Sequence, residues 1–141
     1  MDTTATHWLM KSEPNKYAFQ QLQKDGRTNW DGVRNNQAAL YLKAMKVGQL
    51  AFFYHSNIEL AVVGIARISR EAFIDPTDPA GRFVAVEVEP VAPLPTPVTL
   101  AQMKADPALA GMTMFRQFRL SVTPIEDAEW THICGLGGYK G

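Results

Sequence analysis

Residues 49–69, QLAFFYHSNIELAVVGIARIS, contain two long apolar runs that are separated by only four residues. The first run, residues 49–55, is nearly continuous in apolar and aromatic side chains, and the second, residues 60–69, is rich in Val and Ile. Runs of this length and composition are typical of buried strands. A crossover connection between parallel strands needs about a dozen residues or more, so the short spacing predicts an antiparallel pair.

The pattern continues outward from this pair. Residues 83–90 alternate cleanly, with Val84, Val86 and Val88 on one face, which predicts a half-buried strand. A stiff, extended, proline-rich connector follows. Two further strands are expected at residues 7–11 and 119–123. Four helices are expected: residues 17–24, a helix that begins at Asn35 or Asn36 and ends before a C′ residue at Gly48, residues 99–104, and residues 126–134. Thr99 is the expected N-cap of the third. This pattern favours one α+β domain over residues 1–141, a small, partly closed, mostly antiparallel β-barrel with short helices packed around it.

Composition excludes several classes of protein. The chain has 141 residues and a single cysteine, so the fold cannot depend on an internal disulfide. Residues 1–6 resemble no signal peptide, and no window approaches the roughly 20 apolar residues of a membrane helix, so we expect a cytoplasmic protein without a membrane partner. Fourteen basic residues balance fourteen acidic ones, which argues against strong non-specific nucleic-acid binding.

Metal and nucleophilic chemistry find little support. His7, His55 and His132 are far apart and match no ligand spacing, so we expect no metal and no cofactor. The glycines of residues 135–138 are interpreted as a tail rather than a phosphate loop. A hydrolase would need a nucleophile such as Ser12 activated by His55, but no orienting group or strained elbow is indicated.

Three segments combine aromatic and polar side chains in an unusual way. They are residues 8–14 (WLMKSEP), 30–35 (WDGVRN) and 52–56 (FFYHS). Aromatic faces can stack on a planar heterocycle, while hydroxyl, amide and imidazole groups satisfy its edge. Together they indicate a polar-aromatic binding pocket.

These segments resemble the EVE domain family, and weaker agreement extends the resemblance over about residues 7–134. The resemblance implies a PUA-like fold, similar to that of YTH domains. It also implies a module without catalytic machinery or cofactor that recognises a modified base, for example a methylated one, in DNA or RNA, with the base flipped out of the strand.

The resemblance and the chemistry of the segments together suggest roles for individual residues. Trp30 lies outside any periodic apolar stripe, so we expect it at the mouth of a pocket, stacked on the base, rather than in the core. The base edge would be contacted by Ser12, Asn35 and His55, with Ser56 beside them. Phe53 and Tyr54 would form or support the wall. The expected phosphate contacts are Lys11, Arg34, Arg116 and Arg119.

Two alternatives remain open. The same pocket would serve as a sensor of a free small molecule such as a nucleoside, or His55 would act as the base of a hydrolase. Strand binding weakens steeply with salt, whereas nucleoside binding does not, so salt dependence separates the first alternative from a nucleic-acid reader. We expect a monomer.

Overall fold

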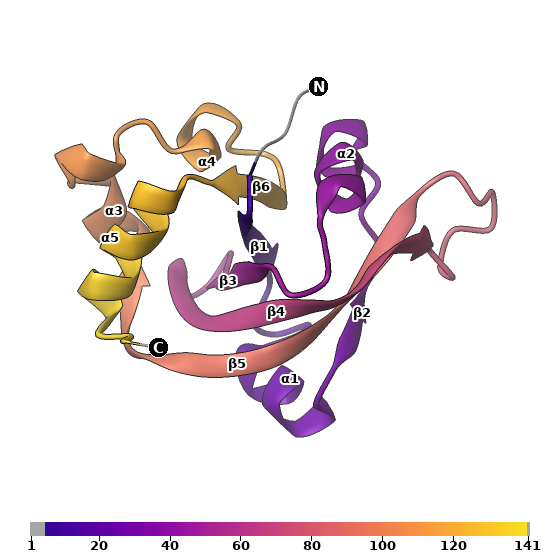
Figure 1. Ribbon diagram of the computed structural model, residues 1–141, viewed down its shortest axis with the longest axis horizontal. Coiled ribbons are helices and arrows are strands. Elements are labelled where there is room, and N and C mark those ends of the chain that lie inside the picture. The colour runs from indigo at the N-terminus through magenta and orange to yellow at the C-terminus, as the bar shows by residue number, and fades with distance from the viewer. Residues whose placement is uncertain (1–4, 141) are drawn as a thin grey trace.

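The computed structural model describes residues 5–140, which form six strands, five α-helices and one short 3₁₀ helix (Figure 1). The six strands lie in one sheet in the order β2-β5-β4-β3-β1-β6. The elements, in chain order, are β1 (His7–Ser12), α1 (Phe19–Asp25), β2 (Thr28–Trp30), α2 (Asn36–Ala44), β3 (Leu50–His55), β4 (Ala61–Ile74), β5 (Val84–Thr99), α3 (Leu100–Lys104), η1 (Pro107–Leu109), α4 (Thr113–Arg116), β6 (Val122–Ile125) and α5 (Asp127–Gly137).

The sheet is mixed, and its strand order does not close. The expected antiparallel pairing of β3 with β4 is confirmed, and β5 continues the sheet antiparallel to β4. One pair is parallel, because β1 lies beside β3 with His7 opposite Leu50 and Ser12 opposite His55. Within residues 5–140, β2 and β6 pair with one neighbour each and form the edges. The α+β class is therefore confirmed, but the expected barrel is not.

Both faces of the central strands are buried. Along β1 and β3, Trp8, Met10 and Phe53 face a core cluster that includes side chains of α1 and α2. Leu9 and Phe52 face the opposite cluster, together with side chains of α3 and α5. Side chains alternate across a strand, so burial of both faces explains why residues 49–55 are apolar without interruption. Figure 1 shows α3 and α5 gathered on one side of the molecule and α2 on the other.

The proline-rich residues after Pro90 are part of β5 rather than a separate connector. Proline cannot donate to a ladder and occurs in strands where the pairing is irregular. The β4–β5 register shifts between Val62 and Gly64 and between Ile65 and Ala66. Pro93 and Pro90 pair next to these shifts, opposite Gly64 and Ala66. The expected extended conformation is confirmed, and the bulges explain how prolines fit into the sheet.

Helix ends agree with the sequence in two cases and differ in two others. Asn35 Oδ1 accepts a hydrogen bond from the Ala38 N–H at 3.0 Å, and Thr99 caps α3 in the same way. Gly48 is not the C′ residue of α2, because the helix ends at Ala44. The glycines after Cys134 are not a tail, since α5 continues to Gly137, where a Cβ would lie 2.9 Å from Leu94. Glycine there permits close packing of α5 on β5.

The last strand also differs from its prediction. Only Val122 and Thr123 of the expected residues 119–123 belong to β6, which runs from Val122 to Ile125. Leu120 is buried as expected, but it lies in the connection from α4. The short helices η1 and α4 and the three-residue strand β2 had no periodic signal long enough to be predicted.

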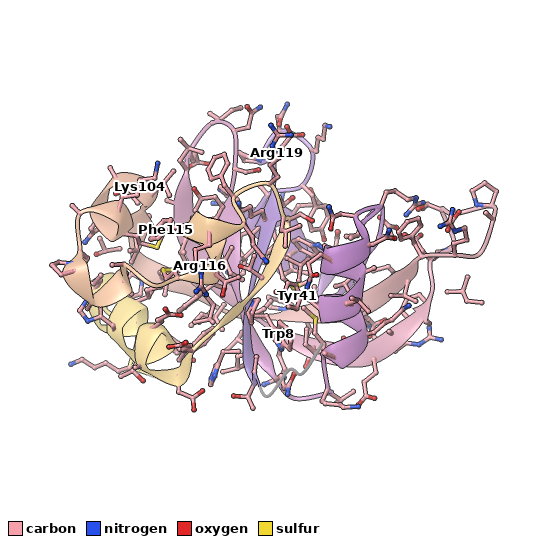
Figure 2. All side chains as sticks on the ribbon, turned by 90° about the horizontal axis from the view of Figure 1, so that it is seen from above. Trp8, Tyr41, Lys104, Phe115, Arg116 and Arg119 are labelled. Atoms are coloured by element: carbon pink, nitrogen blue, oxygen red, sulfur yellow. The ribbon has the colours of Figure 1, made fainter. Side chains whose placement is uncertain are left out.

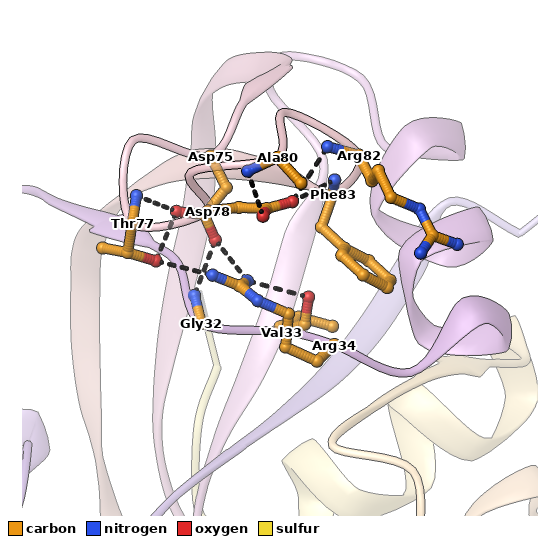
Figure 3. Close-up of polar contacts among 9 residues, drawn as sticks. All are labelled: Gly32, Val33, Arg34, Asp75, Thr77, Asp78, Ala80, Arg82 and Phe83. Atoms are coloured by element: carbon orange, nitrogen blue, oxygen red, sulfur yellow. Dashed lines mark hydrogen bonds and ion pairs between the residues drawn. The ribbon is translucent and has the colours of Figure 1, made fainter.

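A buried carboxylate ties the β4–β5 loop to residues 32–34 (Figure 3). Asp75 has no exposed side-chain surface, and its Oδ2 accepts hydrogen bonds from the Gly32 N–H at 2.7 Å and from Arg34 at 3.0 Å. Its Oδ1 accepts from the backbone and hydroxyl of Thr77. Burial opposes ionisation, but the bonds from Thr77, Gly32 and Arg34 outweigh it and lower the pKa of Asp75 to about 2. The network fixes the backbone that follows Trp30.

No helix within residues 5–140 is long and apolar enough to span a membrane. The same residues contain no group of three or more His, Cys, Asp or Glu side chains placed to hold a metal ion.

Gly64→Ala should destabilise the protein. A Cβ at this position would lie 2.6 Å from the ring of Phe19, which is itself buried and packed edge-on against Phe53. Overpacking of this kind costs about 1–3 kcal/mol, measurable as a lower free energy of unfolding in urea. Gly135→Ala is the matched control: a Cβ there meets no atom within 4 Å, and a helical Gly→Ala change stabilises by about 0.5–1 kcal/mol. Equal stability of the two variants would contradict the packing argument.

Asp75→Asn should remove part of the pH dependence of stability. The folded-state pKa of Asp75 lies below the ordinary value of about 3.9. The ionised carboxylate therefore stabilises the wild type above about pH 4, and this stabilisation is lost as the pH falls toward 2. At neutral pH the variant should lose about 1.5–3 kcal/mol, typical of hydrogen bonds to a charged group. Urea unfolding from pH 7 to pH 2 measures both effects, and Asp31→Asn, an exposed carboxylate of the same segment, should follow the wild type.

Candidate nucleic-acid interface

A cleft of about 760 Å³ opens where the three aromatic-polar segments meet. Because β1 and β3 are parallel neighbours, their carboxyl ends lie at the same edge of the sheet, with Lys11 opposite Tyr54. The Ser56 N–H donates to the Ser12 carbonyl and continues this pairing beyond the strands. We call this cavity the central cleft; it is lined by Lys11, Ser12, Glu13, Lys16, Trp30, Asp31, Gly32, Val33, Arg34, Asn35, Tyr54, Ser56, Asn57, Leu60, Leu100, Phe118, Arg119, Leu120 and Ser121.

Tyr54 supplies a polar atom that the protein itself leaves unused. Its side chain is 2 % exposed and lines the central cleft, yet its hydroxyl makes no hydrogen bond with any residue of 5–140. Burial raises the pKa of Tyr54 to about 12, so the hydroxyl keeps its proton at neutral pH. The oxygen itself is open to the cleft, because within residues 5–140 the buried side-chain polar atom without a partner is Thr123 Oγ1 and not the Tyr54 hydroxyl. Tyr54 can therefore donate to, and accept from, a molecule in the cleft.

Trp30 lines the cleft, but it also belongs to the hydrophobic core. This corrects the expectation that it lies at the mouth of a pocket and outside the core. It ends β2, is 8 % exposed, and packs edge-on against Phe53 with ring centroids 5.4 Å apart. Sequence periodicity gave no indication of this, because β2 has only three residues. Truncation of a buried tryptophan costs about 3–5 kcal/mol, so Trp30 contributes to stability as well as to the surface of the cleft.

His55 does not reach the cleft, contrary to its expected contact with a base edge. The imidazole is 1 % exposed, its Nε2 accepts a hydrogen bond from the Phe19 N–H at 3.1 Å, and its Nδ1 lies 2.9 Å from Glu59 Oε1. Acceptance at Nε2 assigns the proton to Nδ1, which donates to Glu59. Phe53 takes one of the two positions expected for it, support of the wall from behind: it is 1 % exposed, and its ring packs edge-on against Trp30 and Phe19. Both residues support the site from the core.

Three further predicted residues line the cleft with their polar groups already engaged. Ser12 Oγ donates to the Tyr17 carbonyl at 2.7 Å. The amide oxygen of Asn35 caps α2, and Arg34 binds Asp75 and Thr77. Arg34 is thus a structural ion-pair partner, although 39 % of its side chain is still exposed. Ser56 lines the cleft as predicted.

Of the two arginines predicted near the C-terminus, Arg119 lines the cleft and Arg116 does not. Arg119 lines the cleft, is exposed, and has no ion-pair or hydrogen-bond partner within residues 5–140. Arg116 does not line the cleft and donates to Thr113 in its own helix. Figure 2 shows the two side chains well apart, with Arg116 below Phe115.

Lys11 lines the cleft, and its ammonium group is held by the Phe118 carbonyl and by two aromatic rings. Its Nζ donates to the Phe118 carbonyl at 2.9 Å and lies 5.0 Å from the centroid of the Phe118 ring and 5.9 Å from that of Tyr54. Partial burial lowers the pKa of Lys11. A cation held over two aromatic faces at the cleft is placed to meet a negatively charged group.

Two exposed apolar residues of the cleft, Phe118 and Leu60, were not among the predicted site residues; we call them the apolar rim. Phe118 lines the cleft with 60 % of its surface exposed, and Leu60 does so with 42 %. The β3–β4 turn that carries Leu60 is strained, because Asn57 and Leu60 have φ angles of 72° and 36°. Strain of this kind costs energy and tends to occur at functional sites. Phe118 lies in no periodic pattern, and Leu60 was counted in the apolar run of residues 60–69 although β4 begins only at Ala61, so the spatial arrangement is what identifies both residues.

The sequence matches the family model of the EVE domain over residues 6–136. Human thymocyte nuclear protein 1 is 34 % identical in an alignment that spans 94 % of this chain and 74 % of the human protein.

Two solved structures share this arrangement of elements. The protein Rpa0253 from Rhodopseudomonas palustris is 47 % identical, with a TM-score of 0.89 over 96 % of this chain and 94 % of the other. The human THYN1 protein in complex with DNA containing 5-methylcytosine is 31 % identical, with a TM-score of 0.86 over 96 % of this chain and 99 % of the other. The match to the family model, together with identity above 30 % along most of both chains, shows that the chain belongs to the EVE domain family.

Proposed function

We propose that this protein is a non-catalytic module that binds DNA containing a modified base such as 5-methylcytosine, and that the central cleft holds that base flipped out of the strand. The observation that carries the proposal is the cleft itself, which Trp30 lines and in which the Tyr54 hydroxyl has no partner within residues 5–140. The relative whose structure contains DNA with 5-methylcytosine is 31 % identical and has a TM-score of 0.86, which favours DNA over RNA as the strand.

The size and lining of the cleft support a base as its occupant. Its volume of about 760 Å³ falls within the roughly 300–1,000 Å³ typical of small-molecule pockets. Trp30 and Tyr54 offer aromatic surface, and a methylated pyrimidine carries both an apolar methyl group and hydrogen-bonding edges. The Tyr54 hydroxyl would bond to one edge of the base, while Trp30 would contact its face or its methyl group.

The charges around the cleft support a strand rather than a free nucleoside. Lys11 and Arg119 line the opening, and Arg119 has no partner within residues 5–140. Lys16 also lines the cleft but forms an ion pair with Glu13 at 2.8 Å. We therefore assign phosphate contacts to Lys11 and Arg119 and withdraw Arg116, whose position is outside the cleft.

The arrangement around His55 supports binding over hydrolysis. A general base needs a free lone pair within reach of the proton that it removes. The Nε2 lone pair of His55 is occupied by the Phe19 N–H, and the Ser12 hydroxyl donates to the Tyr17 carbonyl. Neither group is poised for nucleophilic chemistry.

Tyr54→Phe should weaken binding without weakening the fold. The free hydroxyl has no hydrogen bond to lose within residues 5–140, so the free energy of unfolding should stay constant or rise slightly. Removing one hydrogen bond to the ligand costs about 0.5–1.5 kcal/mol, and up to about 3 kcal/mol if a polar edge is left unpaired. Affinity for a fluorescein-labelled 12-mer duplex with one central 5-methylcytosine should therefore fall about tenfold in a fluorescence-anisotropy titration. The control Tyr139→Phe, outside the cleft, should bind like the wild type, and unchanged affinity of Tyr54→Phe would remove the hydroxyl from the proposed contact.

Arg119→Gln should reduce the salt dependence of binding. Loss of one phosphate contact lowers the slope of log K against log salt concentration by about one unit, and it weakens binding to modified and unmodified duplexes alike. Titrations between 50 and 200 mM KCl measure the slope; these concentrations span about a fourfold range. Lys43→Gln, an exposed lysine of α2 outside the cleft, should retain the wild-type slope. Tight binding of 5-methyl-deoxycytidine alone, with no salt dependence for any DNA, would instead favour a nucleoside sensor.

A further inference from the structure

A second cavity adjoins the central cleft and shares one residue with it. This side pocket has a volume of about 620 Å³ and is lined by Lys104, Ala110, Phe115 and Phe118. Phe118 lines both cavities, and 60 % of its surface is exposed. Phe118 therefore stands at the boundary between the two, with the Lys11 ammonium 5.0 Å from its ring centroid and most of its surface open to a ligand.

The turn that carries Phe118 is held firmly from three directions. The Leu120 N–H donates to the Gln117 carbonyl at 3.1 Å and closes the turn. Lys11 Nζ donates to the Phe118 carbonyl, and the Tyr41 hydroxyl bonds to Gln117 Oε1 at 3.3 Å. These bonds fix the backbone from which the Phe118 ring projects, and a preorganised backbone lowers the entropy cost of a stacking contact.

The charge of the side pocket differs from that of the β3–β4 turn. Lys104 lines the side pocket, and it has no ion-pair or hydrogen-bond partner within residues 5–140. The side pocket therefore combines two aromatic rings with one uncompensated cation and has no acidic lining residue. The β3–β4 turn, which also lines the central cleft through Asn57 and Leu60, carries the exposed Ile58 and the carboxylate of Glu59. A polyanion that extends beyond the cleft would be attracted by Lys104 in the side pocket and repelled by Glu59 in the β3–β4 turn.

We propose that the side pocket is a second nucleotide subsite, which binds the nucleotide adjoining the modified one. Phe118 stacks on the neighbouring base, with Phe115 completing the apolar surface, and Lys104 meets the phosphate beyond it. Alternating aromatic and cationic side chains along a groove are how proteins hold successive nucleotides. The proposal rests on the proposed function, because it takes the modified base to lie in the central cleft.

The test begins with substitutions in the side pocket, titrated with the 12-mer duplex that carries one central 5-methylcytosine. Base–aromatic stacking is worth about 1–3 kcal/mol, so Phe118→Ala should bind about five- to a hundredfold more weakly. Phe118→Trp should restore binding, because it keeps an aromatic face. Lys104→Gln should lower the salt slope by about one unit. The controls Val47→Ala and Lys43→Gln change an exposed apolar and an exposed basic residue outside both cavities and should bind like the wild type.

A double-mutant cycle separates stacking from a loss of structure. Duplexes with an abasic site immediately 5′ or 3′ of the 5-methylcytosine remove each neighbouring base in turn. One of the two should weaken wild-type binding by about the same factor as Phe118→Ala, and it should have little further effect on that variant.

Independent effects of Phe118→Ala and of both abasic sites, or wild-type affinity of Phe118→Ala, would overturn the subsite while leaving the central cleft intact. Failure of the wild-type protein to bind any of these duplexes would instead overturn the proposed function, and the subsite with it.

Discussion

The parallel pairing of β1 with β3 is the constraint on which the site depends. In an antiparallel pair, residues 11–12 and 54–56 would lie at opposite edges of the sheet. Parallel pairing puts Lys11 beside Tyr54 and lets the Ser56 N–H bond to the Ser12 carbonyl. Parallel neighbours need a long connection, and here residues 13–49 supply it with α1, β2 and α2. The same connection delivers Trp30 and residues 31–35 to the cleft, so topology and site have one cause.

Burial of both faces of these central strands stabilises that arrangement. Phe53 contacts Phe19, Trp30 and His55 through edge-to-face ring packing, with centroids between 5.3 and 5.6 Å apart. Such pairs add about 0.5–1.5 kcal/mol each beyond the area they bury. The core therefore extends directly behind the cleft, and the residues that shape its wall also stabilise the fold. The Tyr54 hydroxyl, Lys11, Arg119 and the exposed Phe118 and Leu60 line the cleft without a structural hydrogen bond or ion pair that fully occupies them.

Much of the fold could be predicted from local sequence, because the signals were local. The apolar run at residues 49–55 predicted β3, the alternation at residues 83–90 predicted the start of β5, and Asn35 and Thr99 predicted two helix caps. The parallel pair and the open sheet could not be predicted, since strand neighbours far apart in the chain leave no periodic trace.

For the site, the three segments did meet in space, but residue type alone could not separate His55, which supports the cleft from the core, from Trp30 and Tyr54, which line it. Phe118 was missed because an isolated exposed phenylalanine has no pattern in sequence.

The network around Asp75 has a consequence for how the two kinds of electrostatic contact respond to ions. The Asp75 carboxylate is fully buried, and mobile ions screen a buried charge much less than one at the surface. Arg119 and Lys104 are exposed, so mobile ions in the solvent screen their charges. Rising ionic strength should therefore weaken the proposed contacts of Arg119 and Lys104 with a strand, while residues 32–34 keep their conformation. Under the proposed function, release of the strand by salt and unfolding of the cleft wall are separate events, so one strand can be exchanged for another while the cleft stays folded.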